Sequence, residues 1–326
     1  MKAIVQNSYG GPETWELQDI PAPAAGEDDV LVEVRAAALN AWDWHMMRGD
    51  PYLSRLMLGA LRRPKRTVRG RDVAGVVAAV GRNVTEFRPG DEVYGDLGSA
   101  EGAFAEFACV PRGQVARKPV NVTFEEAAAV PLAANTALTG LRDVADVQSG
   151  QRVLVNGASG GVGTFAVQLA KAFGAHVTGV CSTGNVDLVR GLGADTVVDY
   201  TRDDFTAERY DVVFDLVGNR SLTALRRAAG PHGTVVLSGG GVYRGGSVVG
   251  PIGLILRGQL TNPFVRQRVV VLGESPNTRN LDTLRELIEA GELTPRIDRT
   301  YPLTEASAAV RYVEEEHARA KVVLTM

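Results

Sequence analysis

A glycine-rich stretch at residues 156–163 carries the clearest chemical signal in the sequence. It reads Asn156-Gly157-Ala158-Ser159-Gly160-Gly161-Val162-Gly163 and lies between an apolar run and a segment with helical periodicity. Glycines permit a tight strand-to-helix turn and let backbone N–H groups approach a pyrophosphate at the helix N-terminus. We therefore interpret residues 159–163 as a dinucleotide-binding turn, although Ala158 stands at the first glycine position of the pattern. A tight turn without a ligand is the simpler alternative.

The segment about twenty residues further on indicates which dinucleotide is bound. In NAD-binding proteins an acidic residue at this place holds the ribose 2′-hydroxyl. Here the sequence is Cys181-Ser182-Thr183-Gly184-Asn185, with hydroxyl and amide donors and without a carboxylate that would repel a 2′-phosphate. Ser182 and Asn185 therefore favour NADPH as the cofactor. No arginine stands at the strand end itself, which leaves use of both cofactors open.

Short valine-rich runs alternate with helical segments from about residue 121 onward. Strands are expected at 152–156, 176–180, 196–198, 211–214 and 234–237, and helices at 164–173 and 186–192. Runs that are apolar on both faces are typical of a buried parallel sheet. The alternation predicts an α/β fold with a doubly wound parallel sheet. Val217, Ser238 and Gly239 follow two of the later strands and would lie at the edge where dinucleotides bind.

The first 120 residues and the C-terminal part have a different character. Short β runs at 3–5, 30–34, 73–80 and 92–94 are separated by glycine and proline turns, which indicates a compact β-rich domain. Thr123 and Glu126 have the spacing of a helix capping box. Near the C-terminus, a leucine stripe at 281–288 predicts one helix, Thr304 can cap another, and 321–324 is expected as a last strand.

Composition limits the class of protein. The chain has 326 residues, which favours two domains, and its 45% apolar and 22% charged residues are ordinary for a globular protein. With 35 basic and 38 acidic side chains the net charge is −3, so we expect no nucleic-acid and no membrane partner. Cys109 and Cys181 cannot make a disulfide scaffold, and the polar N-terminus does not have the pattern of a signal peptide. We expect a reduced, cytoplasmic protein.

Taken together, these motifs resemble the medium-chain dehydrogenase/reductase superfamily, in its zinc-independent quinone oxidoreductase-like branch. The resemblance covers nearly the whole chain and rests on residues 1–5 with 9–10, 38–43, 70–77, 80–81, 89–93, 158–163, 192–195 with 199–200, and 319–323. It implies a GroES-like catalytic domain formed by residues 1–120 and 273–326. It also implies a Rossmann dinucleotide-binding domain over residues 121–272.

A catalytic zinc is not expected. Zinc-dependent relatives carry a cysteine where this chain has Asn40, and Gly-His-Glu where it has Gly70-Arg71-Asp72. A catalytic zinc needs three Cys, His or acidic ligands and one open position. The sequence assembles no ligand set of this kind.

The resemblance implies a set of residues around the nicotinamide and the substrate. Asn40 and Asp43 match an Asn and an Asp beside the nicotinamide, with Trp42 in a place where the branch usually has proline or a small residue. Thr136 matches a threonine near the nicotinamide. Tyr52 stands one residue beyond the place of a tyrosine implicated in related enoyl reductases, where its phenol could relay a proton. A turn role for Asn40 and a packing role for Tyr52 are the alternatives.

The resemblance also implies contacts to the adenosine half and to the closed cofactor. Tyr200 and Asn185 match positions that hold the adenosine phosphate, and a lysine often stands where this chain has Asn185. His317, Ala318 and Arg319 match a C-terminal stretch that closes over NADPH. A solvated position at a helix end is the alternative for His317.

We therefore expect a zinc-independent, NADPH-dependent oxidoreductase that transfers hydride to a quinone or an α,β-unsaturated carbonyl in the cleft between its domains. A zinc-free alcohol or aldehyde dehydrogenase and a non-catalytic NADPH-binding redox sensor are the alternatives. Relatives are commonly homodimers, which leaves a homodimer open. The basic run 62–71 lacks interleaved aromatic residues, so we interpret it as a solvated loop and not as a nucleic-acid site.

Overall fold

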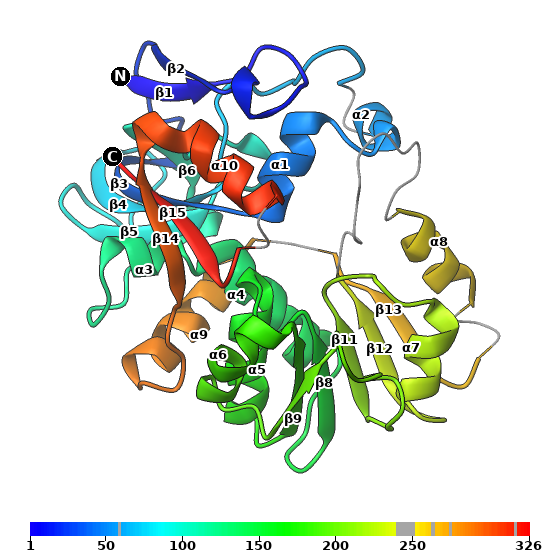
Figure 1. Cartoon of the computed structure of the whole chain (residues 1–326). Coiled ribbons are helices and arrows are strands. Elements are labelled where there is room, and N and C mark those ends of the chain that lie inside the picture. The colour runs from blue at the N-terminus through cyan, green and yellow to red at the C-terminus, as the bar shows by residue number, and fades with distance from the viewer. Residues whose placement is uncertain (58–59, 239–251, 262–264, 274–275, 316–317) are drawn as a thin grey trace. The chain divides into compact units, whose positions relative to one another are not determined.

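A computed structural model describes residues 1–57, 60–238, 252–261, 265–273, 276–315 and 318–326 (Figure 1). The chain forms two compact units. The first comprises Met1–Asn135, Ser275–Gly291 and Pro295–Met326, and the second comprises Thr136–Glu274 and Glu292–Thr294. Residues 121–135, which the sequence analysis assigned to the dinucleotide-binding domain, thus lie in the first unit. Among the described residues, no helix is long and apolar enough to cross a membrane.

The first unit is built on a seven-stranded sheet with the path β14-β15-β3-β4-β5-β7, to which β6 is added through β3. A separate antiparallel pair is formed by β1 and β2. The strands are β1 (Lys2–Val5), β2 (Glu16–Asp19), β3 (Asp29–Leu39), β4 (Asp72–Val80), β5 (Glu92–Asp96), β6 (Phe107–Pro111), β7 (Val115–Arg117), β14 (Ile297–Pro302) and β15 (Lys321–Thr325). The C-terminal strand β15 pairs antiparallel with β3, so both ends of the chain build one sheet.

Short helices connect and cover these strands. They are α1 (Ala41–Arg48), α2 (Tyr52–Met57), α3 (Phe124–Ala128), α9 (Thr278–Glu289) and α10 (Ala306–Glu315). Helix α4 (Pro131–Leu138) begins in the first unit and ends in the second, since the division falls between Asn135 and Thr136. The predicted capping box at the start of α3 is confirmed, because Glu126 N donates to Thr123 Oγ1 at 3.2 Å and Thr123 N donates to Glu126 Oε2 at 2.9 Å. The leucine stripe at 281–288 forms α9, whose buried face includes Leu281, Leu284 and Ile288.

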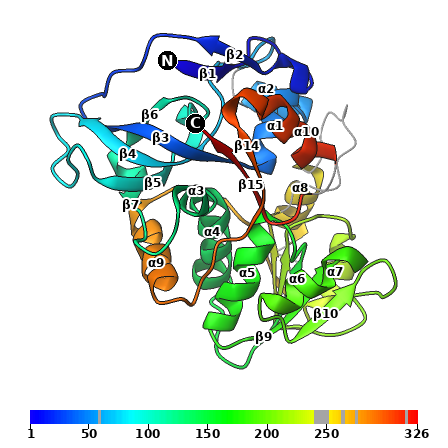
Figure 2. The same ribbon diagram turned by 60° about the vertical axis from the view of Figure 1, so that its left-hand side comes forward.

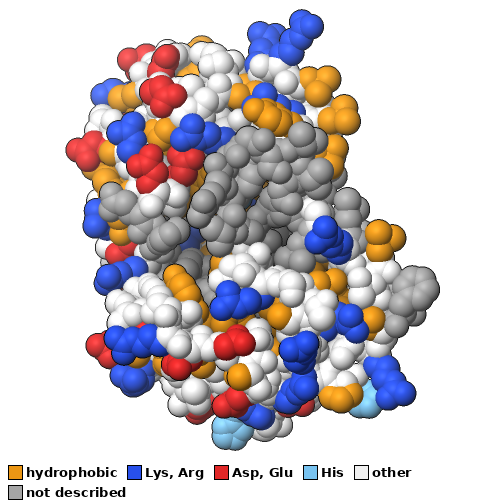
Figure 3. Space-filling model, turned by 45° about the vertical axis from the view of Figure 1, so that its right-hand side comes forward, with side chains coloured by type: hydrophobic (Ala, Val, Ile, Leu, Met, Phe, Trp, Pro, Cys, Tyr) orange, Lys and Arg blue, Asp and Glu red, His pale blue; other side chains and the backbone are white. Residues whose placement is uncertain are grey.

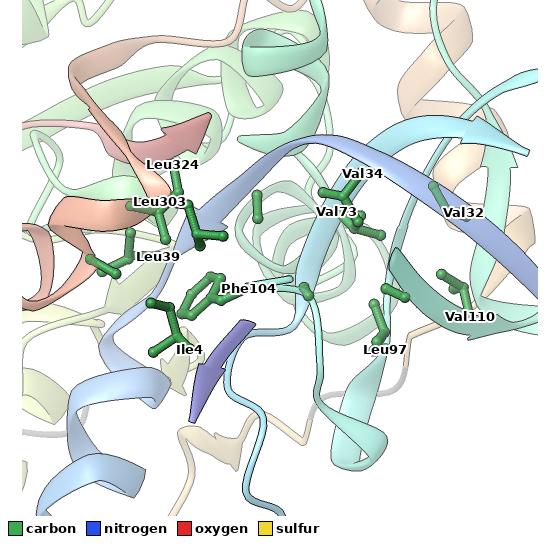
Figure 4. Close-up of a cluster of buried hydrophobic side chains, with 14 of the residues drawn as sticks. Ile4, Val32, Val34, Leu39, Val73, Leu97, Phe104, Val110, Leu303 and Leu324 are labelled. Atoms are coloured by element: carbon green, nitrogen blue, oxygen red, sulfur yellow. The ribbon is translucent and has the colours of Figure 1, made fainter. Parts of the chain in front are cut away.

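A hydrophobic cluster fills the first unit between its sheet and the elements around it. Figure 4 shows Phe104 beside Ile4, with Leu39 and Leu303 nearby. Residues of β3 alternate between buried and less buried positions along its first half, which is the pattern of a strand with one face in a core. Leu324 of β15 joins this cluster, so the C-terminal strand contributes to the core as well as to the sheet.

The second unit has the predicted doubly wound fold. Its parallel sheet has the order β10-β9-β8-β11-β12-β13, formed by β8 (Arg152–Asn156), β9 (His176–Cys181), β10 (Thr196–Asp199), β11 (Val212–Asp215), β12 (Thr234–Leu237) and β13 (Arg268–Val271). The helices are α5 (Gly161–Ala172), α6 (Val186–Gly191), α7 (Leu222–Ala228) and α8 (Ile252–Thr261). Helix α5 packs on β8 and β9, and α6 on β9 and β10 (Figure 2). The strand order reverses between β8 and β11, which is where such sheets bind dinucleotides.

Candidate cofactor and substrate site

The glycine-rich turn joins β8 to α5, and two of its glycines are required by the fold. Gly157 has φ +88°, and a Cβ there would lie 2.7 Å from Val217 Cγ2. A Cβ on Gly163 would lie 2.0 Å from the carbonyl oxygen of Gly157, because the first turn of α5 packs directly on the loop. These contacts explain Gly157 and Gly163 without any ligand.

Gly160 is different, because neither its conformation nor its packing requires glycine. It is the N-cap of α5 with φ −82° and ψ 176°, and a Cβ would meet only Gly157 O, at an ordinary 3.4 Å. It has no side chain to cap the first N–H groups of the 12-residue helix. The helix N-terminus therefore presents uncapped N–H groups and space for an anionic group, which fits the pyrophosphate of a dinucleotide.

A matched pair of alanine substitutions separates these roles. We expect Gly163→Ala to destabilise the fold by about 1–3 kcal/mol through overpacking. Gly160→Ala should leave the free energy of unfolding within about 0.5 kcal/mol but weaken NADPH binding, because its methyl group enters the cofactor space. Urea unfolding and NADPH titration would measure both effects. Wild-type NADPH affinity in Gly160→Ala would contradict the assignment.

The polar loop after β9 joins three predicted cofactor residues. Asn185 Nδ2 donates to Ser159 Oγ at 3.1 Å and to Ser182 Oγ at 3.2 Å. Asn185 Oδ1 is buried and has no hydrogen-bond partner within the described part of the chain. A buried acceptor without a donor is costly, so this atom fits a ribose hydroxyl or an amino group of a bound dinucleotide.

A carboxylate and a cation stand at the end of the neighbouring strand β10: Asp199 is its last residue and Arg202 follows it. The sequence identifies Asp199 only as part of a family motif and does not single out Arg202. Asp199 Oδ2 accepts from Thr183 Oγ1 at 2.5 Å, and the Arg202 Nε lies 3.6 Å from the same oxygen. The hydrogen bond from Thr183 is the main cause that lowers the pKa of Asp199. The loop 181–185 itself therefore has no carboxylate, but Asp199 lies beside it. The positive charge of Arg202 offsets the negative charge of Asp199. Tyr200, beside them, is 42% exposed and accessible to a ligand.

The ends of β8 and β11 are tied together at the point where the strand order reverses. Asp215 Oδ1 accepts from Asn156 Nδ2 at 2.7 Å and from Gly218 N at 3.1 Å, and Val217 N lies 3.3 Å from the same atom. These bonds hold the turn that carries Val217. Ser238 follows β12 and donates its N–H to Asp215 O at 3.0 Å. Gly239 lies outside the described residues.

In the first unit, Asn40 and Asp43 begin helix α1. Asn40 N donates to Asp43 Oδ2 at 2.7 Å, which makes Asp43 a capping residue. Asp43 has no exposed surface, and burial raises the pKa of its carboxyl to about 7. Asp43 is thus a buried capping group, and its expected place beside the nicotinamide stays a prediction.

Asn40 is held by a buried ion pair between strands β4 and β15. Its Nδ2 donates to Asp72 Oδ2 at 3.0 Å, and Lys321 Nζ donates to its Oδ1. Lys321 Nζ also lies 3.3 Å from Asp72 Oδ2, and the side chains of Lys321 and Asp72 are 2% and 0% exposed. The sequence identifies Asp72 and Lys321 only as parts of the family motifs at 70–77 and 319–323. Pairing of Val322 with Leu39 across β15 and β3 brings Lys321 beside Asn40.

The remaining predicted residues lie in several environments. Tyr52 opens α2, is 47% exposed and has the Arg55 guanidinium 4.7 Å from its ring centroid. Thr136 is buried in α4. Arg319 is exposed and its backbone N–H donates to Asp298 Oδ2 at 3.0 Å, whereas Ala318 packs against the core of the first unit. His317 lies outside the described residues.

Comparisons with known proteins agree with this architecture. The family model for the alcohol dehydrogenase GroES-like domain matches residues 26–120, and that for zinc-binding dehydrogenase matches residues 192–324. The 2-methylene-furan-3-one reductase of Solanum lycopersicum is 38% identical over 338 residues, covering 99% of this chain and 79% of that protein. The chloroplastic NADPH-dependent alkenal/one oxidoreductase of Arabidopsis thaliana is 35% identical over 343 residues, with the same two coverages.

This chain belongs to the medium-chain dehydrogenase/reductase family. A solved structure of the quinone oxidoreductase from Coxiella burnetii is similar over 100% of this chain and 99% of that one, with a TM-score of 0.83 and 28% identity. The predicted family and the predicted fold class, a GroES-like domain with a Rossmann sheet, are confirmed.

Arg71 is the residue that the family resemblance places where zinc-dependent medium-chain dehydrogenase/reductases carry a histidine. The Arg71 guanidinium is buried and forms a bidentate pair with Asp96, with Nε–Oδ1 at 2.9 Å and Nη2–Oδ2 at 2.7 Å. It also lies 5.3 Å from the Trp42 ring centroid. No group of three His, Cys, Asp or Glu side chains suited to a metal ion is found in the part of the chain that the structure describes.

The loop after β9 provides a direct test of cofactor choice in this member of the family. Ser182→Asp would place a second carboxylate beside Asn185, where it repels a 2′-phosphate and can accept from a ribose hydroxyl. We expect weaker binding of NADPH and stronger binding of NADH relative to it. Titration of both cofactors would measure the change, with Ser182→Asn as the uncharged control. Tighter binding of NADH than NADPH by the wild type would refute the assignment.

Proposed function

We propose that this chain is an NADPH-dependent oxidoreductase that reduces an α,β-unsaturated carbonyl or a quinone. Binding of NADPH is supported by the uncapped N-terminus of α5 at Gly160, next to the hydrogen-bonded cluster of Ser159, Asn185 and Ser182. The substrate class is supported by two relatives, one named a 2-methylene-furan-3-one reductase and the other an NADPH-dependent alkenal/one oxidoreductase.

The described residues fit the cofactor, and different residues would bind different parts of it. The N–H groups at the start of α5 would bind the pyrophosphate, and Ser182 with Tyr200 would bind the adenosine phosphate. When bound, NADPH supplies the hydride that reaches the electron-poor carbon of the substrate. Tyr52 carries a phenolic proton that would go to the enolate left after reduction of an enone. Asp72, Lys321 and Asp43 keep Asn40 in one conformation.

The experiment that tests this proposal is an NADPH-oxidation screen over enones, quinones and aldehydes with the purified chain. We expect turnover of enones or quinones. Turnover limited to alcohols with NADP⁺ would favour the alternative dehydrogenase. Tight NADPH binding without turnover of any of these substrates would favour a non-catalytic redox sensor.

We further propose that the activity is zinc-independent, because Arg71 occupies the place of a zinc ligand and is neutralised by Asp96. A guanidinium group has no lone pair to donate to a metal ion, so Arg71 cannot serve as a zinc ligand. Elemental analysis of the purified protein is expected to find no stoichiometric zinc, and a chelator should leave NADPH oxidation intact. One zinc per chain would overturn this prediction.

Three broader assignments belong to the same proposal. Cys109 and Cys181 are free thiols, which supports a reducing, cytoplasmic location. We also propose that the first unit is the catalytic domain and the second unit the dinucleotide-binding domain. A homodimer is the proposed assembly, and sedimentation velocity would test it.

A further inference from the structure

Two large apolar side chains stand exposed on α2 and the segment that follows it. Leu56 is 60% exposed and Leu61 is 62% exposed. Ala60 N donates to Arg55 O at 2.8 Å, and Ala60 O accepts from Tyr9 OH at 2.7 Å, so the chain after α2 is held back against the helix. The two leucines flank this anchor along the chain. Exposed apolar side chains that gather in a patch are typical of an interaction surface.

A run of cations follows directly on these leucines. Arg62, Arg63, Lys65 and Arg66 are all exposed, and none of them has an ion-pair partner among the described residues. The following arginines, Arg69 and Arg71, are buried and paired with Glu101 and Asp96. No acidic residue occurs between positions 51 and 66. The local charge is therefore strongly positive although the whole chain carries −3.

We propose that this basic-apolar patch, formed by Leu56, Leu61, Arg62, Arg63, Lys65 and Arg66, docks on the surface of an anionic lipid bilayer. The four unpaired cations complement anionic headgroups, and the leucines beside them can enter the boundary between headgroups and acyl chains. Figure 3 shows Lys/Arg and hydrophobic side chains next to one another at the upper end of the face that it draws.

Other occupants fit the patch less well. Nucleic acid would gain nothing from two exposed leucines, and residues 62–66 offer no aromatic ring for base stacking. A second copy of the chain, placed symmetrically on the patch, would bring the same cations together and repel. We expected no membrane partner because the net charge of the whole chain is only −3. That total does not reveal the positive charge concentrated in this patch. Attachment through this patch does not depend on which reaction the chain catalyses.

The first test is co-sedimentation of the full chain with vesicles of phosphatidylcholine and phosphatidylglycerol, compared with vesicles of phosphatidylcholine alone. We expect binding to the anionic vesicles that weakens with added salt, because surface charges are screened. Each cation contributes on the order of fivefold to affinity. Changing Arg62, Arg63, Lys65 and Arg66 together to Gln should therefore lower binding by on the order of a hundredfold or more.

A matched variant controls for the change in net charge. Arg82, Arg88, Arg152 and Arg190 are exposed cations outside the patch, and changing these four to Gln should leave vesicle binding close to wild type. Leu56→Ser with Leu61→Ser should weaken binding without changing charge. Thermal unfolding and NADPH oxidation in solution would show that each variant is folded.

Three results would overturn the proposal. The first is wild-type protein that does not bind anionic vesicles. The second is equal loss of binding in the patch variant and in the matched variant. The third is a concentration-dependent dimer that the leucine variant abolishes in sedimentation velocity, since a second copy would then occupy the patch.

Discussion

Tyr52→Phe is expected to lower kcat for reduction of an enone by about 10²–10⁴-fold, which is the usual contribution of a positioned general acid. The substitution removes the phenolic proton and keeps the ring that packs against Arg55. NADPH affinity should be unchanged, because all proposed contacts to its adenosine phosphate and pyrophosphate lie in the second unit. A lost positioning bond without proton transfer would give a smaller effect.

Steady-state kinetics with one enone and one quinone, together with NADPH titration, would measure this effect. Reduction of a quinone needs less help from a carbon-directed proton donor, so its kcat should fall less. Tyr301→Phe, on strand β14, is the matched control and should keep wild-type kcat for both substrates. An unchanged kcat for the enone in Tyr52→Phe would remove Tyr52 from the site and leave proton delivery to water.

Lys321→Met is expected to lower the free energy of unfolding by about 3–5 kcal/mol, because it leaves a buried carboxylate without its counter-ion. The Asp72 side chain is 0% exposed, and Lys321 Nζ lies 3.3 Å from its Oδ2. The same change removes the hydrogen bond to Asn40 Oδ1, so the Asn40 amide should lose its fixed orientation. Both consequences follow from one missing ammonium group.

Chemical denaturation would compare Lys321→Met with the double variant Lys321→Met/Asp72→Asn. The double variant should recover part of the loss, since no unpaired charge remains buried. Lys171→Met is the matched control, because its Nζ lies 2.8 Å from Asp195 but both side chains are about a third exposed or more. A surface pair of this kind contributes about 0–1 kcal/mol. Equal losses in the two lysine variants would contradict the role of burial.

Local sequence patterns predicted those parts of the fold that depend on neighbours along the chain. Three features are each determined by residues only a few positions apart: the capping box at Thr123, the glycine turn at 156–163 and the valine-rich strands. The parallel sheet then follows, because β-α alternation leaves few other arrangements. The family resemblance extended this prediction to the first unit.

The parts of the site that depend on distant pairing could not be predicted in this way. Asp199 and Arg202 lie near Thr183 only because β10 is next to β9, and Lys321 reaches Asn40 only because β15 pairs with β3. The role of Asp43 was also hidden, since the same residue type serves as a cap or as a ligand contact. The burial of Asp43, which the sequence does not show, is a property of the folded unit.

The position of β15 has a consequence for synthesis on the ribosome. Strands β3 and β4 are made early, but β15, which pairs with β3, is translated after all the other strands of that sheet. Until Lys321 emerges, Asn40 and Asp72 lack their cation, and the edge of β3 toward β15 is open to wrong partners. The second unit, which is encoded almost entirely between these segments, can fold while the first waits. A premature stop before β15 is therefore expected to give an aggregating product and not a weakened enzyme.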